Sequence, residues 1–185
     1  MIETIEKTYS WLDRPPVSGH PSMLKDRAIV EFIDDVTIQL GTDSERHLFS
    51  RIADLMMHGS YYPDEIITFD GRFRQEGREL KAGDRVLQLA RLPFLFGYRT
   101  RTVTEISVAE RTDCRCVIGY YTTTQHFAKG WWQATLLFDP NQGLTLNVKC
   151  QARPQSLLYW LAIPIARFMQ ERARKAAMSR FLSWV

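Results

Sequence analysis

The residue with the clearest potential for chemistry is His126, which follows a run of hydroxyl-bearing residues. Thr122, Thr123 and Thr124 precede it, and their hydroxyl groups can orient an imidazole by hydrogen bonding. Because histidine titrates near neutral pH, an oriented imidazole can pass protons to or from a bound molecule. His126 is therefore the candidate catalytic residue. The alternative is that the ring only hydrogen-bonds the loop or a helix end, and the sequence leaves both roles open.

Charged residues offer two further kinds of chemistry. Arg101 shares a predicted strand face with Arg99, and Arg153 lies just before the last predicted helix. Either Arg101 or Arg153 could bind an anionic head group, although surface ion pairs would use the same side chains. Asp34 and Asp35 are adjacent, so on a regular strand they point to opposite faces and cannot act together as acid and base. We expect a solvated bend or bulge at these two residues.

Two adjacent tryptophans, Trp131 and Trp132, also split between the faces of a strand. Core packing and the wall of a ligand pocket would explain the inward member almost equally well. The outward member, with Phe127 and Lys129 nearby, would form an exposed amphipathic patch of the kind that contacts a partner or a membrane. The sequence does not decide which one faces inward, and Trp131 is the one assigned to the predicted ligand site.

No motif with a self-sufficient mechanism accompanies these residues. The chain contains no glycine-rich phosphate loop, nucleophile elbow, His-Glu-x-x-His or Cys-x-x-Cys, which argues against nucleotide-binding and protease functions. Its three cysteines, Cys114, Cys116 and Cys150, lack the additional ligands that a zinc site needs. We expect reduced, buried thiols, no metal and no cofactor.

Length and composition indicate one soluble globular domain. The chain has 185 residues, of which 45% are hydrophobic and 24% are charged, close to the averages for such proteins. The net charge is +3 and the basic residues are interspersed with acids up to residue 165, so no nucleic-acid partner is expected. The longest apolar stretch, 157–166, is too short to cross a membrane, and acids near the N-terminus argue against a secretory signal. We predict a cytoplasmic location.

The first part of the chain is predicted to form an arm, a strand and a helix. Residues 1–26 form the arm, because four prolines and glycines between residues 15 and 21 prevent regular structure after a short amphipathic piece. Residues 27–40 have the β-branched and aromatic composition of a strand. The capping box at 42–45 then predicts a helix that carries an apolar stripe and ends at His58 and Gly59.

The rest of the chain is predicted to form a sheet and one long helix. Six short segments rich in β-branched and aromatic residues, separated by turn residues, indicate an antiparallel meander. These segments are residues 65–69, 84–92, 100–109, 114–122, 131–138 and 144–152. Residues 156–184 have a helical composition, with a kink expected at Pro164. The residues of this helix expected to pack into the core are Ile165, Phe168, Met169, Ala173, Ala176, Ala177, Phe181 and Trp184. Residues 27–185 should thus form one α+β domain in which a curved antiparallel sheet grips the helix.

This order of elements resembles the helix-grip fold of START-like, or birch-pollen-allergen-like, proteins (the SRPBCC superfamily). Tyr120, Thr122, His126 and Gly130 are similar to a Tyr-Gly-Thr-Leu-x-Gly-His motif, with Gly four residues after the His, in the domain of unknown function 1990 family. The segment 151–154, Gln-Ala-Arg-Pro, resembles that family's Phe-Ser-Arg-Pro. Where the family has Glu after the Gly, this chain has Trp131. The resemblance implies the fold and a ligand pocket, and it implies no established reaction.

The leading hypothesis is that a cavity between sheet and C-terminal helix binds a hydrophobic or amphipathic small molecule. The predicted ligand-binding residues are Tyr120, Thr122, His126, Trp131, Arg101 and Arg153. One alternative is an enzyme of the cyclase, dehydratase or hydrolase type that uses His126 in the same pocket. Another is an interaction or peripheral membrane protein that uses the basic C-terminal helix, where five Arg and Lys residues outnumber the single Glu171. A weak contact with a membrane surface and a homodimer stay open, and the fold alone decides none of these.

Overall fold

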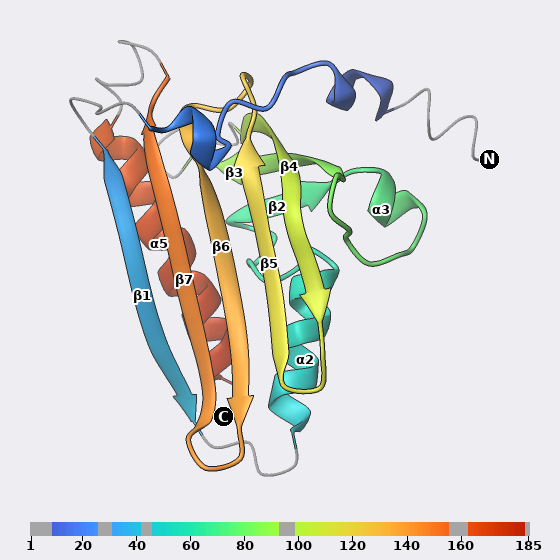
Figure 1. Cartoon of the computed structure of the whole chain (residues 1–185), viewed down its shortest axis with the longest axis vertical. Helices are drawn as coiled ribbons and strands as arrows, with labels where there is room; N and C mark the ends of the chain where they lie inside the picture. The colour runs from blue at the N-terminus through green and yellow to red at the C-terminus, as the bar shows by residue number, and fades with distance from the viewer. Residues whose placement is uncertain (1–8, 26–30, 42–45, 93–98, 156–162, 184–185) are drawn as a thin grey trace.

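The computed structural model describes residues 9–25, 31–41, 46–92, 99–155 and 163–183, and seven strands form its framework (Figure 1). In chain order the elements are the 3₁₀ helices η1 (Ser10–Asp13) and η2 (Pro21–Met23), then β1 (Phe32–Gly41), α2 (His47–Met57), β2 (Ile67–Asp70), α3 (Arg72–Gln75), β3 (Arg85–Arg91), β4 (Arg99–Arg111), β5 (Arg115–Thr122), β6 (Ala128–Asp139), β7 (Gly143–Pro154) and α5 (Ile163–Leu182). The six predicted strands after the first helix are all present. The short helix α3 between β2 and β3 was not predicted.

The sheet is antiparallel throughout, with the strand order β1-β7-β6-β5-β4-β3-β2. Strands β2 to β7 therefore pair in chain order as a meander, and β1 adds to the far edge beside β7. Helices α2 and α5 both cover one face of the curved sheet, which we call the inner face, and the N-terminal arm crosses the other (Figure 1). The predicted α+β architecture, a curved antiparallel sheet with a long C-terminal helix, is confirmed.

Strand β1 is regular where a bend was expected. Asp34 pairs with Cys150 and Asp35 with Lys149 in an unbroken register, and the one irregularity of the strand lies between Gln39 and Gly41. Asp34 is half-buried on the inner face and Asp35 is exposed on the outer face. The prediction of a bend or bulge at these residues was wrong, because each carboxylate has its own cationic partner and needs no distortion to be satisfied. Asp35 pairs with Lys149 across the ladder at 3.1 Å.

Helix α2 ends as predicted at His58, and Gly59 continues the chain with φ +60°. That left-handed conformation is why a glycine stands there. The predicted capping box at 42–45 lies outside the described residues. The buried residues of α2 are Leu48, Phe49, Ile52, Ala53, Met56 and Met57. They pack against the inner face of the sheet and form most of the core with it, so the predicted apolar stripe is confirmed.

Helix α5 buries only its C-terminal half. Ala173, Ala177 and Phe181, spaced four residues apart, are buried on the core side. Ile165 and Phe168 were expected in the core, but their side chains are 52% and 45% exposed, because this part of the helix lies over a hollow part of the sheet. Pro164 is the second residue of the described helix. The segment 156–162 and Trp184, on which the kink and the outer ends of the predicted helix depend, lie outside the described residues.

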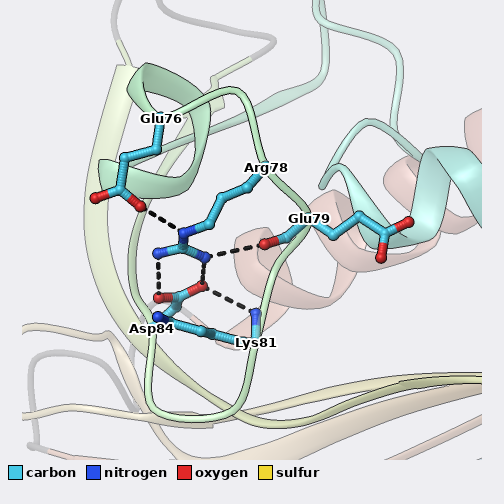
Figure 2. Close-up of polar contacts among 5 residues, drawn as sticks. All are labelled: Glu76, Arg78, Glu79, Lys81 and Asp84. Atoms are coloured by element: carbon cyan, nitrogen blue, oxygen red, sulfur yellow. Dashed lines mark hydrogen bonds and ion pairs between the residues drawn. The ribbon is translucent and has the colours of Figure 1, made fainter.

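A cluster of charged residues fixes the connection from α3 to β3 (Figure 2). Arg78 donates to both carboxylate oxygens of Asp84, at 2.7 and 2.9 Å, and to the backbone carbonyl of Glu79 at 2.9 Å. Its Nε also donates to the carboxylate of Glu76, and Asp84 accepts from the backbone N–H of Lys81 at 2.9 Å. The cluster closes a short loop onto itself, so it sets where β3 begins.

The N-terminal arm packs on the outer face of the sheet. Leu12 is fully buried beside Leu87 and Val103, and Asp13 accepts two hydrogen bonds from Arg72 at 2.7 and 3.0 Å. Farther along, the N–H groups of residues 18 and 19 donate to the carbonyl of Thr122. The arm therefore contacts the end of β5, next to the loop that carries His126. A boundary between arm and domain at residue 26 stays a prediction.

The three cysteines form no disulfide. Cys116 is buried and Cys150 is half-buried, whereas Cys114 is exposed, because it lies in the turn before β5. The prediction of buried thiols was wrong for Cys114.

None of the described helices combines the length and the apolar composition that spanning a lipid bilayer requires.

Candidate ligand-binding cavity

A cavity of about 380 Å³ lies between the inner face of the sheet and α5. All seven strands, the end of α2 with the segment after it, and most of α5, from Ile163 to Phe181, contribute to its lining. The volume falls within the range of roughly 300–1,000 Å³ of small-molecule sites. Helix α2 packs on the other end of the inner face. The hollow therefore lies under α5, the helix whose residues Ile165 and Phe168 are largely exposed.

Stacked aromatic rings form one wall of the cavity. Tyr120 and Trp132 are direct cross-strand partners, and their ring centroids lie 5.3 Å apart at 19°. Tyr61 stacks on Trp132 at 5.6 Å and 5°, and Tyr62 lies 4.6 Å from Tyr61. Burial raises the pKa of Tyr62 and of Tyr120, so both phenols stay neutral at neutral pH. The wall is therefore largely aromatic, and its tyrosine hydroxyl groups are neutral.

A charged pair joins the edge strand to α5 beside this wall. Arg167 donates to both oxygens of Asp34, at 2.9 and 3.3 Å, and stands 5.2 Å from the ring of Phe32. These hydrogen bonds outweigh desolvation and lower the pKa of Asp34. Burial raises the pKa of the neighbouring Cys150 to about 11. At neutral pH Asp34 is therefore a carboxylate and Cys150 a thiol, and neither is poised as a general acid or nucleophile.

His126 lies in the β5–β6 loop and borders the cavity. Its Nδ1 lies 3.0 Å from both the backbone N and the backbone O of Ala128. Burial lowers the pKa of His126 to about 4, although the Ala128 carbonyl acts in the opposite direction. The ring is therefore neutral at neutral pH. Because the Ala128 N–H can only donate, we assign Nδ1 as its acceptor, which leaves the proton on Nε2.

The loop around His126 is tied down by hydrogen bonds. The His126 N–H donates to the carbonyl of Thr123 at 3.0 Å, and the Gln155 side chain donates to the carbonyls of Thr123 and His126 at 2.8 and 2.9 Å. The Thr122 hydroxyl accepts from the Gly130 N–H at 2.8 Å. The expected hydroxyl groups thus hold backbone rather than the imidazole, and the ring is positioned by Ala128.

Gly130 is a strand residue and forms no turn. A Cβ on it would lie 2.1 Å from the carbonyl oxygen of Gln151, and a Cβ on Gly19 would lie 1.8 Å from the carbonyl oxygen of Gly130. Gly130 allows the arm and β7 to approach β6 closely, next to the His126 loop.

The two tryptophans leave β6 on opposite faces, as predicted. Trp132 points inward, because its cross-strand partners Tyr120 and Cys150 border the cavity. The indole of Trp131 lies on the outer face, where its Nε1 donates to Gln151 at 3.0 Å. Residue 131 also borders the cavity, but the ring that forms the wall belongs to Trp132.

The two predicted arginines lie in different places. Arg101 is exposed on the outer face of β4, whereas its neighbours Thr100 and Thr102 border the cavity. Arg153 borders the cavity and donates to the carbonyl of Met23 at 2.7 Å. The structure thus brings Tyr120, Thr122, His126 and Arg153 to one hollow and places Arg101 across the sheet. Sequence reasoning missed Trp132, Tyr61, Tyr62 and the Asp34–Arg167 pair. Within the described residues, no three or more His, Cys, Asp and Glu side chains are grouped to hold a metal ion.

Comparisons with solved structures identify the fold. A hypothetical protein from Helicobacter pylori, jhp0584, is 11% identical, with a TM-score of 0.54 over 91% of this chain and 95% of that one. The Zhui aromatase/cyclase from Streptomyces sp. R1128 is 14% identical, with a TM-score of 0.51 over 83% of this chain and 93% of that one. At these identities the likeness is one of fold, which is that of START-like proteins.

Comparisons of sequence give the family. No curated protein matches the chain. The family described as a domain of unknown function, DUF1990, matches residues 31–180, which include every strand, α2 and most of α5. The predicted resemblance is confirmed: the chain belongs to the DUF1990 family and has its helix-grip, START-like fold.

Proposed function

We propose that this protein binds a hydrophobic or amphipathic small molecule in the cavity between the sheet and α5. The observation that carries the proposal is a hollow of about 380 Å³ walled by the stacked rings of Tyr61, Tyr120 and Trp132. Side chains that line an apolar hollow have fewer protein atoms to contact than side chains in a filled core, so they make fewer dispersion contacts within the protein. A ligand with an apolar body would restore those contacts.

Adjacent positions on β7 allow the proposal to be tested with a matched control. Val148 borders the cavity, whereas Lys149 is exposed on the outer face. Val148→Phe should occupy part of the hollow and reduce binding, and Lys149→Phe adds a comparable ring outside it. We would screen fatty acids, phospholipids, sterols and flavonoids for a rise in the melting temperature, and examine the purified protein by native mass spectrometry for an adduct. If no compound stabilises the wild type and no adduct is found, or if both variants bind equally well, the proposal fails.

A second candidate function is an enzyme on the same cavity, favoured by the position of His126. With Nδ1 accepting from Ala128, the Nε2–H of a neutral ring can donate a hydrogen bond to a carbonyl oxygen and polarise it, as a cyclase, dehydratase or hydrolase requires. The structural likeness to an aromatase/cyclase concerns fold alone and adds no weight. His126→Asn preserves an acceptor for the Ala128 N–H. If the protein chemically changes a bound compound, this variant should bind it unchanged and convert it more slowly.

The remaining expectations stay predictions. These are a cytoplasmic location, a contact of the basic helix with a membrane surface, and a homodimer.

A further inference from the structure

Positively charged side chains outnumber negatively charged ones around the cavity. Five arginines border it but only two acids, and one acid is already used, because Asp34 pairs with Arg167. The arginines are Arg91, Arg153, Arg167, Arg172 and Arg174, and the second acid is the exposed Glu171. A hollow with apolar walls concentrates the field of such a cationic surplus. The imbalance therefore favours anions at this cavity over neutral or cationic molecules.

Among these cations, Arg174 is placed most clearly on the cavity side of α5. It is half-buried and follows Arg167 by seven residues, about two helical turns, so the two guanidinium groups leave the helix on the same side. Its charge contributes to the lowered pKa of Asp34 on β1 and partly opposes the rise that burial causes in the pKa of Tyr62 after α2. Arg174 therefore lies within electrostatic reach of both sides of the hollow.

Arg174 differs from Arg167 in having no ion-pair partner among the residues that the structure describes. Over the described part of the chain its side chain forms neither an ion pair nor a hydrogen bond. Glu171, one turn earlier on the helix, is exposed and forms no ion pair with it in that part of the chain. A partly buried guanidinium without an anion has lost hydration that no protein group replaces. An anion brought into the cavity would supply charge-assisted hydrogen bonds in a weakly screened setting.

We infer that the ligand of this cavity is an amphipathic anion, whose acidic head binds Arg174 while its apolar body lies against the wall of Tyr61, Tyr120 and Trp132. This inference rests on the proposed binding function and adds the class of ligand to it. The Asp34–Arg167 pair is already complete, so it anchors α5 to β1 beside the head. A carboxylate and a phosphate monoester share the chemistry that Arg174 would recognise.

The test compares ligands that share one alkyl chain and differ in the head: dodecanoic acid, dodecyl phosphate and 1-dodecanol. Near pH 7 the first two are anionic. Wild-type protein should bind at least one of them about tenfold or more tightly than the alcohol, the size expected of one charge-assisted hydrogen bond. Which of the two binds more tightly identifies the preferred head. Binding is measured by isothermal titration calorimetry and by the shift in melting temperature.

Two variants on adjacent residues separate recognition by Arg174 from a general effect of charge. Arg174→Gln should lose about tenfold in affinity for the acid and bind the alcohol as the wild type does. Lys175→Gln removes the same charge from the exposed side of α5 and should retain the preference for the acid. Arg174→Lys, which keeps the charge, should retain part of it. Without ligand, Arg174→Gln should melt no lower than the wild type, because it removes a cation that lacks an anion.

Two results would overturn the inference while leaving the proposed function standing: equal affinity of the wild type for acids and alcohol, or equal losses in Arg174→Gln and Lys175→Gln. If the wild type binds none of the three compounds and the broader ligand screen is also negative, the proposed function fails together with the inference.

Discussion

The inner face of the sheet has two halves with opposite properties, although the same strands build both. The packed half, defined by Cys116, Ile118, Leu136 and Leu144, is covered by α2, and all four residues are buried. The open half, defined by Asp34, Tyr120, Trp132 and Cys150, is covered by α5 and encloses the cavity. The alternation of side chains is the same in both.

Under the proposed function, stability and binding are separated along the length of the strands. In the packed half, α2 fills the concave surface and buries its own apolar stripe there. In the open half, Arg167 of α5 donates to Asp34 of the edge strand β1. The apolar residues Ile165 and Phe168 of this helix are largely exposed, and Ile165 borders the cavity. A substitution in the packed half should therefore change the free energy of unfolding, and one in the open half should mainly change ligand binding.

The largest effect is expected in the packed half. Leu136→Ala leaves a cavity against α2 and should lower the free energy of unfolding by about 2–5 kcal/mol. Phe168→Ala removes a larger side chain from the exposed start of α5 and should cost about 0.5 kcal/mol or less. Denaturant unfolding of both variants, followed by circular dichroism, measures the two values. Equal losses would show that the first half of α5 belongs to the core after all, as its sequence suggested.

A smaller difference is expected between two of the bidentate Arg–Asp pairs, Arg78–Asp84 and Arg167–Asp34. Asp84→Asn breaks the local Arg78 cluster of Figure 2 and should cost about 1–3 kcal/mol without changing ligand affinity. Asp34→Asn breaks the more exposed pair at the cavity and should cost about 1 kcal/mol or less. Because it also releases the cation of Arg167, affinity for dodecanoic acid should rise. Unchanged affinity in Asp34→Asn would show that this pair plays no part in the site.

A further expected effect, confined to acidic pH, is a pH dependence due to His126. Its pKa is about 4 in the folded protein and about 6.5 when unfolded, so between these values the unfolded chain binds more protons. Stability is therefore fully present above about pH 6.5 and is lost as the pH falls toward 4. His126→Asn should lose less stability than the wild type between about pH 6.5 and about pH 4. The denaturant midpoints of both proteins across this pH range would measure the difference. If the variant and the wild type lose stability in parallel, the imidazole is not buried in its neutral form.

The fold could be predicted because its signals are local. Strand β5 was expected at 114–122 and runs from Arg115 to Thr122, since β-branched and aromatic residues lie between turn residues. The end of α2 followed from His58 and Gly59 in the same way. Which half of α5 is buried depends on the curvature of the sheet beneath it, and no pattern within residues 163–182 encodes that curvature.

The candidate site was harder to predict from the sequence, because it depends on contacts between distant segments. Asp34 and Arg167 are 133 residues apart, and nothing local in either segment indicates that they meet. The choice between Trp131 and Trp132 depends on the register of the β5–β6 hairpin, in which Tyr120 pairs with Trp132. That register would have identified the inward tryptophan once Tyr120 was taken as inward. His126 and Thr122 were found from the family motif, and the roles of their side chains needed the structure.

Locating a bound molecule in a crystal would test directly whether the open half holds an amphipathic molecule. A crystal structure of the protein with 12-bromododecanoic acid gives the position of the bromine from its anomalous signal. We expect a bromine peak inside the hollow against Tyr61, Tyr120 and Trp132, with the carboxylate at Arg174. A hollow without the compound in crystals that contain it elsewhere, or a bromine peak only on the outer face of the sheet, would contradict the account.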